Sequence, residues 1–285
     1  NAFLSIFDPD NTAVDNNNLV LSMKYNSANK AGFGATADAS HTIKYGKVTA
    51  RVKTASVAKG VVSSFIIRDD QSGDEIDFEW VGLSPNQVQT NYYFNDVLDY
   101  TKMVPYDLGK DTSAEFHDYS INWTEDSIVW SVDGKAIRTV NKADTYNATS
   151  KTYAFPSAES RIAFSIWDGG SGAQGTADWA GYPTPWNADT IYKMYVDSVT
   201  VQCNGSSEPS ASSDAEESSA VASSSELNSE SPVEPSDSDV ASNSAASSTG
   251  YATATDAPAT ESPSGSAVSP IYSSTSSVHK CIPRN

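Results

Sequence analysis

The stretch Asp74-Glu75-Ile76-Asp77-Phe78-Glu79-Trp80 has the alternation of a β-strand with one apolar face and one acidic face. Side chains alternate along a strand, so the Ile, Phe and Trp point one way while Glu75, Asp77 and Glu79 point the other. The apolar face predicts a strand that is anchored in a hydrophobic core. Carboxylates crowded on one face disfavour one another's ionisation, which favours a site whose chemistry requires them.

The spacing of the outer carboxylates can be compared with the needs of glycoside chemistry. Four residues at roughly 3.3 Å each separate the Glu75 and Glu79 backbones by about 13 Å. On a concave strand the two side chains lean together and leave their carboxylates about 6 Å apart, between the retaining distance of about 5–5.5 Å and the inverting distance of about 6.5–9.5 Å. Spacing therefore leaves the mechanism open, and a solvated acidic strand face remains an alternative. Asp77, between them, could hydrogen-bond one Glu and keep the two pKa values apart.

Short alternating segments separated by turn residues continue through the first two hundred residues, which is typical of an all-β sandwich. The Asp133-Gly134 pair suits the backbone twist of a tight β-hairpin. No stretch sustains a helical period over three turns. The predicted strands are 19–25, 42–54, 61–68, 75–81, 88–94, 117–124, 127–132, 136–140, 161–167 and 192–202.

Composition divides the chain near Cys203. All six Trp precede that residue, whereas Ser, Ala, Pro, Thr and acidic residues dominate 204–285. Such a segment buries too little apolar surface to offset its ordering entropy, so we predict a folded domain at 1–203 and a disordered tail at 204–285.

The charge balance bears on the class of partner. The formal net charge is −18, and in the tail 11 acidic residues face only Lys280 and Arg284. No basic patch exists to neutralise phosphates, so we expect no nucleic-acid partner. No apolar run approaches the length of a membrane span. A neutral polysaccharide is compatible with this charge.

The acidic strand and its flanks resemble glycoside hydrolase family 16, whose signature is Glu-x-Asp-x-Glu on a strand. The resemblance covers roughly residues 1–203, and it implies a β-jelly roll whose concave sheet forms a sugar-binding cleft. The Asp-Glu-Ile-Asp-Phe-Glu-Trp motif and the Ser-rich tail are most similar to the fungal Crh-type cell-wall transglycosylases. The other segments that carry the resemblance are 45–53, 60–65, 87–93, 117–123, 130–135 and 179–181.

The resemblance implies a two-step retaining mechanism. Glu75 would be the nucleophile that forms a covalent glycosyl-enzyme, Glu79 the acid/base, and Asp77 an auxiliary that hydrogen-bonds Glu75. Arg68, which ends the preceding predicted strand, could also bond Glu75, although a surface Arg beside acidic neighbours is the simpler interpretation.

Substrate-binding side chains follow from strand parity and from the resemblance. Gln89, Asn91 and Tyr93 would share the face of the carboxylates and offer polar groups to sugar hydroxyls. Trp179 resembles a family tryptophan that stacks on a sugar ring, and Trp167 is a second candidate for which a core role is the alternative. We expect no cofactor and no metal.

Three functions compete. The first is a fungal cell-wall transglycosylase with a chitin donor and a β-glucan acceptor, which is what the Crh-type likeness implies. The second is a secreted β-1,3/1,4-glucan hydrolase with the same catalytic residues and water as acceptor. The third is a non-catalytic carbohydrate-binding wall protein, for which three intact acidic residues would serve no purpose.

The remaining features concern secretion. Sequons at Asn122, Asn147 and Asn204 allow N-glycosylation. Cys203 could pair with Cys281, or with a cysteine before residue 1; we favour the second, because closing a disordered tail serves little structural purpose. We expect an extracellular monomer in the fungal cell wall, with any lipid anchor supplied by sequence outside this chain.

Overall fold

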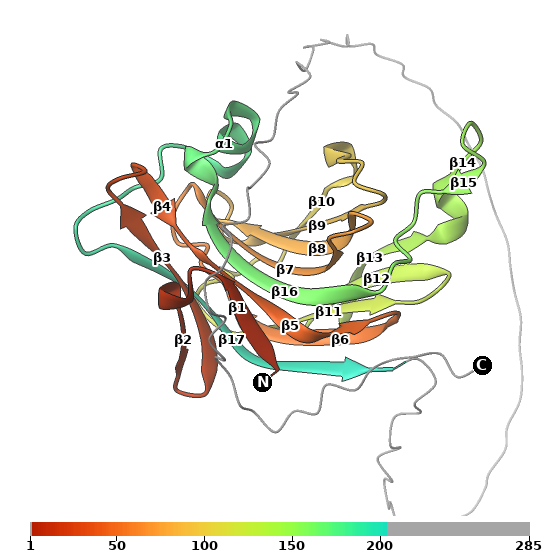
Figure 1. Ribbon diagram of the computed structural model, residues 1–285, viewed down its shortest axis with the longest axis horizontal. Coiled ribbons are helices and arrows are strands. Elements are labelled where there is room, and N and C mark those ends of the chain that lie inside the picture. The colour runs from red at the N-terminus through yellow and green to blue at the C-terminus, as the bar shows by residue number, and fades with distance from the viewer. Residues whose placement is uncertain (1, 204–285) are drawn as a thin grey trace, which may run out of the picture. The chain divides into compact units, whose positions relative to one another are not determined.

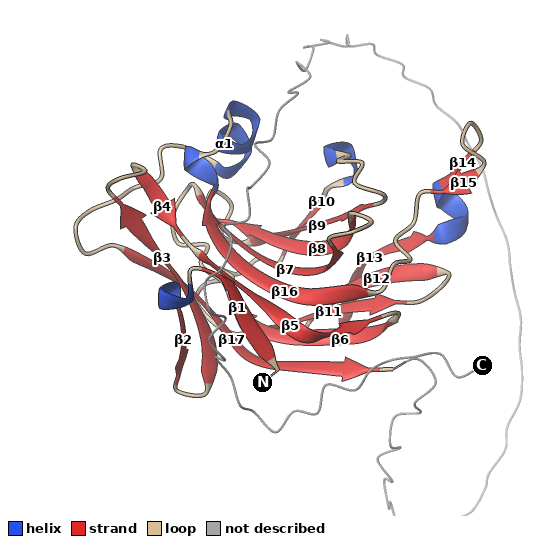
Figure 2. Ribbon diagram, in the orientation of Figure 1, coloured by secondary structure: helices blue, strands red, loops and turns tan. Residues whose placement is uncertain are grey.

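The computed structural model describes residues 2–203, which form two facing antiparallel β-sheets (Figures 1 and 2). We name the seven-stranded sheet the cleft sheet and the eight-stranded sheet the back sheet. The cleft sheet has the order β1 (Phe3–Phe7), β5 (Ala35–Ile43), β16 (Ser160–Asp168), β7 (Val61–Asp69), β8 (Asp74–Val81), β9 (Gln87–Tyr93) and β10 (Val104–Asp107).

The back sheet packs behind it. Its order is β13 (Lys135–Asn141), β12 (Ser127–Val132), β11 (His117–Trp123), β6 (Gly46–Lys53), β17 (Ile191–Gln202), β3 (Asn18–Asn26) and β2 (Thr12–Asp15), with β4 (Ala31–Phe33) beside β3. Outside these sheets lie the small hairpin β14 (Tyr146–Asn147) and β15 (Thr152–Tyr153), and the helix α1 (Gln174–Ala180). The all-β sandwich predicted from the alternation is confirmed, and the predicted tail 204–285 lies outside the described residues.

The core fills the space between the sheets. Ile76, Phe78 and Trp80, the apolar face of the opening motif, are at most 1% exposed and belong to it. Ile121 and Trp130 of the back sheet meet them from the other side and are fully buried. The indole N–H of Trp130 donates to the backbone carbonyl of Asp77 at 2.9 Å, so the back sheet fixes the middle of β8. The acidic face of β8 therefore points away from the core.

The prediction of one strand over 42–54 is wrong. The chain leaves the cleft sheet at Ile43 and enters the back sheet at Gly46, through a turn in which Tyr45 has φ 62° and Gly46 has φ 127°. Two strands of opposite sheets thus meet at this turn. The β-like composition runs straight through it, so only the left-handed backbone reveals the corner.

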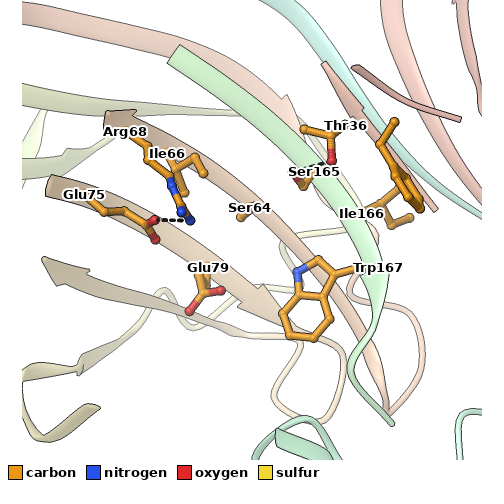
Figure 3. A pocket seen from close by; sticks show the side chains of 10 residues that line it. Thr36, Ser64, Ile66, Arg68, Glu75, Glu79, Ser165, Ile166 and Trp167 are labelled. Atoms are coloured by element: carbon orange, nitrogen blue, oxygen red, sulfur yellow. Dashed lines mark hydrogen bonds and ion pairs between the residues drawn. The ribbon is translucent and has the colours of Figure 1, made fainter. Parts of the chain in front are cut away.

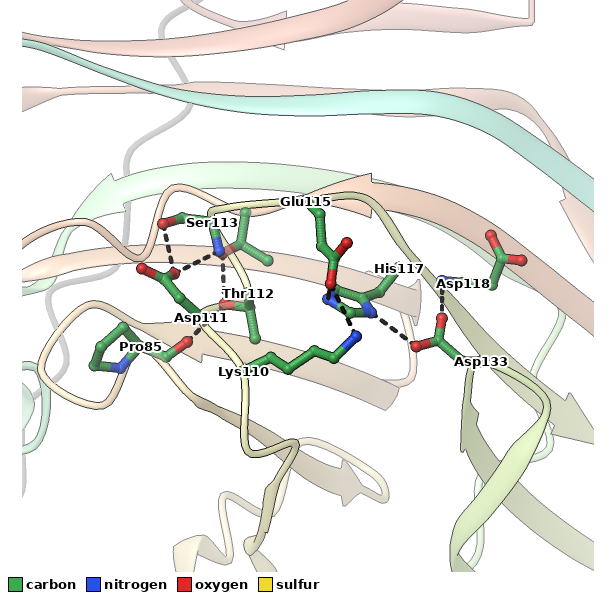
Figure 4. Close-up of polar contacts among 10 residues, drawn as sticks. Pro85, Lys110, Asp111, Thr112, Ser113, Glu115, His117, Asp118 and Asp133 are labelled. Atoms are coloured by element: carbon green, nitrogen blue, oxygen red, sulfur yellow. Dashed lines mark hydrogen bonds and ion pairs between the residues drawn. The ribbon is translucent and has the colours of Figure 1, made fainter.

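A polar cluster fixes the loop between β10 and β11 (Figure 4). The fully buried Thr112 donates from its hydroxyl to the carbonyl of Pro85 at 3.0 Å and lies 2.8 Å from the hydroxyl of Thr54. At the end of the loop, the buried His117 Nδ1 lies 2.8 Å from Asp133 Oδ2 in the predicted Asp-Gly hairpin. Because Pro85 lies in the loop between β8 and β9, this cluster also stabilises the end of the acidic strand.

No helix within residues 2–203 is long and apolar enough to cross a membrane.

Candidate active site

The three carboxylates lie on the open face of the cleft sheet, in the middle of β8. Glu75 and Glu79 line a cleft of about 340 Å³ together with side chains from β7, β16, β5 and β1 (Figure 3). The side chain of Glu75 is 17% exposed, whereas Asp77 between them is only 1% exposed. The two outer acids are therefore within reach of a ligand, and the central acid is covered.

The neighbouring strand β9 sets three polar side chains opposite the acids. Glu75 pairs with Tyr93, Asp77 with Asn91, and Glu79 with Gln89. Residues directly opposite in an antiparallel pair point to the same face, so all six share the open face. The amide of Asn91 donates to the Tyr93 phenol oxygen at 3.0 Å, which orients that hydroxyl. Whether these three side chains bind sugar stays a prediction.

Arg68 on β7 distinguishes Glu75 from the other acids. Its Nη1 donates to Glu75 Oε2 at 3.2 Å, while its Nε contacts Asp70 Oδ1 at 2.9 Å. Both roles considered for Arg68 are therefore present. Burial raises the pKa of Glu75, and the charge and hydrogen bond of Arg68 work against that rise. Arg68 thus favours the carboxylate form of Glu75.

Within residues 2–203, no such cation lies beside Glu79. Its direct neighbour on β7 is Ser64. Burial, and then the negative charge of Glu75, raise the pKa of Glu79 from 4.5 to about 8. Glu79 therefore carries a proton at neutral pH, next to an acid whose rise in pKa is opposed by the charge and hydrogen bond of Arg68. The pair has the asymmetry that separates a general acid from a nucleophile.

Asp77 is the least solvated of the three. Neither carboxyl oxygen makes a hydrogen bond of normal geometry within the described residues, so the predicted bond to Glu75 is not formed in this structure. Burial, followed by the charges of Glu79 and Glu75, raises the pKa of Asp77 well above its ordinary value. The same burial and neighbouring charges favour the neutral, protonated form of Asp77.

Two tryptophans stand at the Glu79 end of the cleft. Trp167 from β16 and Trp179 from α1 stack with ring centroids 5.9 Å apart and an interplanar angle of 28°. The Trp179 indole donates to Gln89 Oε1 at 2.8 Å, which joins α1 to β9. Figure 3 shows Trp167 beside Glu79. Both rings are half-buried and pack against the small apolar cluster of Val62, Val81 and Ala180, and Trp167 also lines the cleft.

Asp74, the first residue of the opening motif, has a structural role that strand parity does not reveal. It is 2% exposed and accepts backbone N–H groups from Asn95, Ser157 and Ala158 at 3.0, 2.7 and 3.0 Å. Two loops distant in sequence are thus held at the start of β8. The sequence did offer one indication. Alternation places the acidic Asp74 on the face opposite to Glu75, Asp77 and Glu79, where an apolar residue would be expected.

Asp168 performs a similar role at the other end of the cleft and was also missed. Its carboxylate accepts the backbone N–H of Gly32 at 2.7 Å and the hydroxyl of Thr184. Thr184 lies in the segment that follows α1. Asp168 therefore joins β4 and the segment after α1 to the end of β16.

Other predicted positions lie away from the cleft. Asn122 lies half-buried on β11 and Asn147 is exposed on β14, while Asn204 lies outside the described residues. Cys203 is disulfide-bonded, and its partner lies outside the described residues. Within residues 2–203, no group of three or more His, Cys, Asp or Glu side chains could hold a metal ion.

A protein-family model, Glycosyl hydrolases family 16, matches residues 1–181. The chain belongs to this family. Among curated relatives, this family 16 chain is 42% identical over 198 residues to Crh-like protein 2 of Aspergillus fumigatus, an alignment that covers 67% of this chain and 43% of that protein. The chain thus spans less than half the length of that relative.

Solved structures with similar folds include both transferases and hydrolases. A Crh5 transglycosylase in complex with NAG is 30% identical, with a TM-score of 0.60, covering 70% of this chain and 78% of the other. A prokaryotic β-1,3-1,4-glucanase (lichenase) derived from a mouse hindgut metagenome is 27% identical, with a TM-score of 0.56, covering 68% and 83%. The jelly-roll fold implied by the sequence resemblance is thereby confirmed.

Proposed function

We propose that this chain is a retaining transglycosylase of the fungal cell wall that transfers chitin chains onto β-glucan through a covalent glycosyl-enzyme. The observation that carries the proposal is the electrostatic asymmetry of β8. Arg68 favours ionised Glu75, while Glu79 without a cation keeps its proton at neutral pH. A nucleophile and a general acid are what the first step of retention requires.

In the first step, the Glu75 carboxylate attacks the anomeric carbon and forms an ester bond. The glycosidic C–O bond breaks, and the proton of Glu79 passes to the departing oxygen. Neutral Asp77, which lies between the two, could donate a hydrogen bond to the carboxylate oxygen of Glu75 that remains outside the ester. Burial of all three acids strengthens these interactions by excluding water.

In the second step, ionised Glu79 accepts a proton from the hydroxyl of an acceptor sugar. The acceptor oxygen attacks the anomeric carbon, and the ester bond to Glu75 breaks. Water in place of the sugar would give hydrolysis with the same residues. Two inversions at one carbon give net retention of configuration.

Sugar binding would involve the polar and aromatic side chains that surround the acids. Gln89, Asn91 and Tyr93 offer hydrogen-bonding groups on the face of the carboxylates. Trp167 and Trp179 offer flat rings that match the apolar C–H face of a pyranose. The similarity to a Crh5 transglycosylase that binds NAG favours a donor built from N-acetylglucosamine.

The test is to incubate the protein with chitin oligosaccharides and a fluorescent laminari-oligosaccharide, and to separate the products by mass and fluorescence. A labelled hybrid would establish transfer with chitin as donor. Shortened oligosaccharides without hybrids would instead favour the β-1,3/1,4-glucan hydrolase, which the similarity to the lichenase supports. If neither product forms but the protein still binds oligosaccharides, the remaining hypothesis is a non-catalytic carbohydrate-binding wall protein.

The nucleophile assignment has its own control. Glu75→Gln should abolish the covalent intermediate, observed by mass spectrometry with a slow fluorinated glycoside, while oligosaccharide binding persists. The proposed mechanism would be refuted by full activity of this variant.

The remaining proposals concern the domain organisation, the location and the glycosylation of the protein. Residues 1–203 would be the catalytic domain and 204–285 a spacer, and the protein would act outside the cell as a monomer. Asn147, exposed on a hairpin, is better suited to carry a glycan than half-buried Asn122.

A further inference from the structure

The catalytic cleft extends well beyond the acids, towards the edge strand β1. Its lining runs from Glu79 across Ser64, Ser165 and Thr36 to Phe7. No role in the mechanism above requires anything so far from the acids. This part of the cleft is therefore a candidate for binding a part of the substrate that does not react.

The strand register shows that these five residues form one continuous row across the cleft sheet. Glu79 pairs with Ser64, Ser64 with Ser165, Ser165 with Thr36, and Thr36 with Phe7. Each is a direct partner of the next, so all lie on the open face of the cleft sheet. Four steps between strands at about 4.8 Å each place the Phe7 backbone about 19 Å from that of Glu79. The row is long enough for several consecutive sugar rings.

A β-bulge is what turns Phe7 into this row. Ser5 pairs with Ala37 and is 2% exposed, but the register shifts between Ser5 and Phe7. Without the shift, alternation would place Phe7 on the same face as Ser5, towards the core. Instead Phe7 pairs with Thr36 and lines the cleft. Bulges of this kind re-aim a side chain beside a functional site.

The chemistry of the row suits a neutral sugar chain. Ser64, Ser165 and Thr36 have short side chains that leave the floor open, and the hydroxyls of Thr36 and Ser165 lie 3.1 Å apart. Figure 3 shows these three between Glu79 and the far strands. Hydroxyl groups can both donate to and accept from sugar hydroxyls. The floor thus offers polar contacts that favour no charged ligand.

Phe7 ends the row with an aromatic ring that packs beside the ring of Phe33. Its ring centroid is 5.0 Å from that of Phe33, at an interplanar angle of 44°, so Phe33 limits its movement. Phe7 nevertheless remains 41% exposed. A ring that served only to pack against Phe33 would have no need of a bulge that opens it to the cleft.

We propose that Phe7 forms a distal sugar-binding subsite, in which its ring stacks on a pyranose of the same neutral polysaccharide chain that reaches the acids. The inference rests on the proposed function for the identity of the ligand. It predicts that only chains long enough to span the row gain from Phe7.

Binding of chitin and laminari-oligosaccharides from disaccharide to octasaccharide, measured by calorimetry, tests this subsite. Phe7→Ala should weaken binding of the long oligosaccharides roughly 2- to 12-fold, the value of an aromatic contact, and leave the disaccharides unchanged. Phe7→Tyr should bind as the wild type does. Phe7→Leu keeps apolar volume against Phe33 without a flat ring, and it should resemble Phe7→Ala even if the latter is unstable.

Ile6→Ala is the matched control. Ile6 is 55% exposed, adjacent in sequence, and not among the residues that line the cleft, so its loss should leave all lengths unchanged. The proposed subsite would be refuted if Phe7→Leu weakened the binding of short and long oligosaccharides equally, or weakened the binding of neither. It would also be refuted if the wild-type protein gained no affinity with ligand length. Length-dependent binding without any transfer product would instead refute the proposed function and leave the subsite intact.

Discussion

Replacing Glu79 with Gln should stabilise the fold, and the gain should grow as the pH rises. The pKa of Glu79 is raised from 4.5 to about 8 by burial and by the charge of Glu75. The folded protein therefore holds this proton after the unfolded chain has released it. Gln has the shape of the protonated acid but does not titrate. The variant therefore does not lose stability at this position as the pH rises.

The sign and size follow from linkage. A raised folded-state pKa gives stability that is fully present below about pH 4.5 and is lost as pH rises towards about 8. Each pKa unit corresponds to about 1.36 kcal/mol, so the full shift is on the order of 5 kcal/mol. Glu79 retains some contact with solvent in the cleft, so we take about 2–4 kcal/mol. For a domain of this size, that equals roughly 4–16 °C in Tm.

Urea and thermal unfolding of the wild type and Glu79→Gln at about pH 5, 6.5 and 8 measure the effect. The difference between the two proteins isolates this group from the other acids. Glu115→Gln is the control, because Glu115 is 56% exposed and the hydrogen bond and charge of Lys110 lower its pKa. That variant should gain no stability with rising pH. A difference for Glu79→Gln that is the same at all three pH values, or that shrinks as pH rises, would refute the reasoning.

Three other substitutions test separate parts of the site. Arg68→Met should move the acidic limb of the kcat/KM profile to higher pH, since the pKa of Glu75 rises without its cation; an unmoved limb would contradict the ion pair's role. Trp179→Phe keeps an aromatic ring but loses the hydrogen bond to Gln89, so calorimetry should show roughly 2- to 12-fold weaker oligosaccharide binding. Unchanged affinity would count against a role for this hydrogen bond in sugar binding. Asp74→Ala leaves three backbone N–H groups without their acceptor and should cost about 3–5 kcal/mol in urea unfolding; a loss below about 1 kcal/mol would exclude this anchoring role.

Local alternation was enough to predict the strand that carries the acids and the face to which they point. The period of two is a property of the backbone, so the parity of Glu75, Asp77 and Glu79 was fixed before any tertiary contact was known. The same holds for the Asp133-Gly134 hairpin, where both residues have positive φ, 49° and 78°. These features depend on neighbours in sequence, which one chain is sufficient to show.

The features that were missed depend on partners far away in sequence. Asp74 bonds to residues 21 to 84 positions later, and Asp168 bonds to a glycine 136 positions earlier. The bulge that exposes Phe7 is visible only when β1 is aligned with β5. The corner at Tyr45 interrupts no hydrophobic pattern, because both flanking strands are composed of β-forming residues. Each of these requires the register between strands, which composition and alternation do not determine.

The proposed acid and the proposed nucleophile show most clearly this dependence on strand register. The motif Glu-x-Asp-x-Glu is symmetrical, so nothing within β8 distinguishes Glu75 from Glu79. The distinction arises on β7, whose register places Arg68 opposite Glu75 and Ser64 opposite Glu79. A shift of that register by two residues would keep every side chain on its face and yet move the cation away from Glu75. The pairing of two neighbouring strands, more than the acidic motif itself, therefore creates the difference between the two carboxyl groups on which their proposed roles rest.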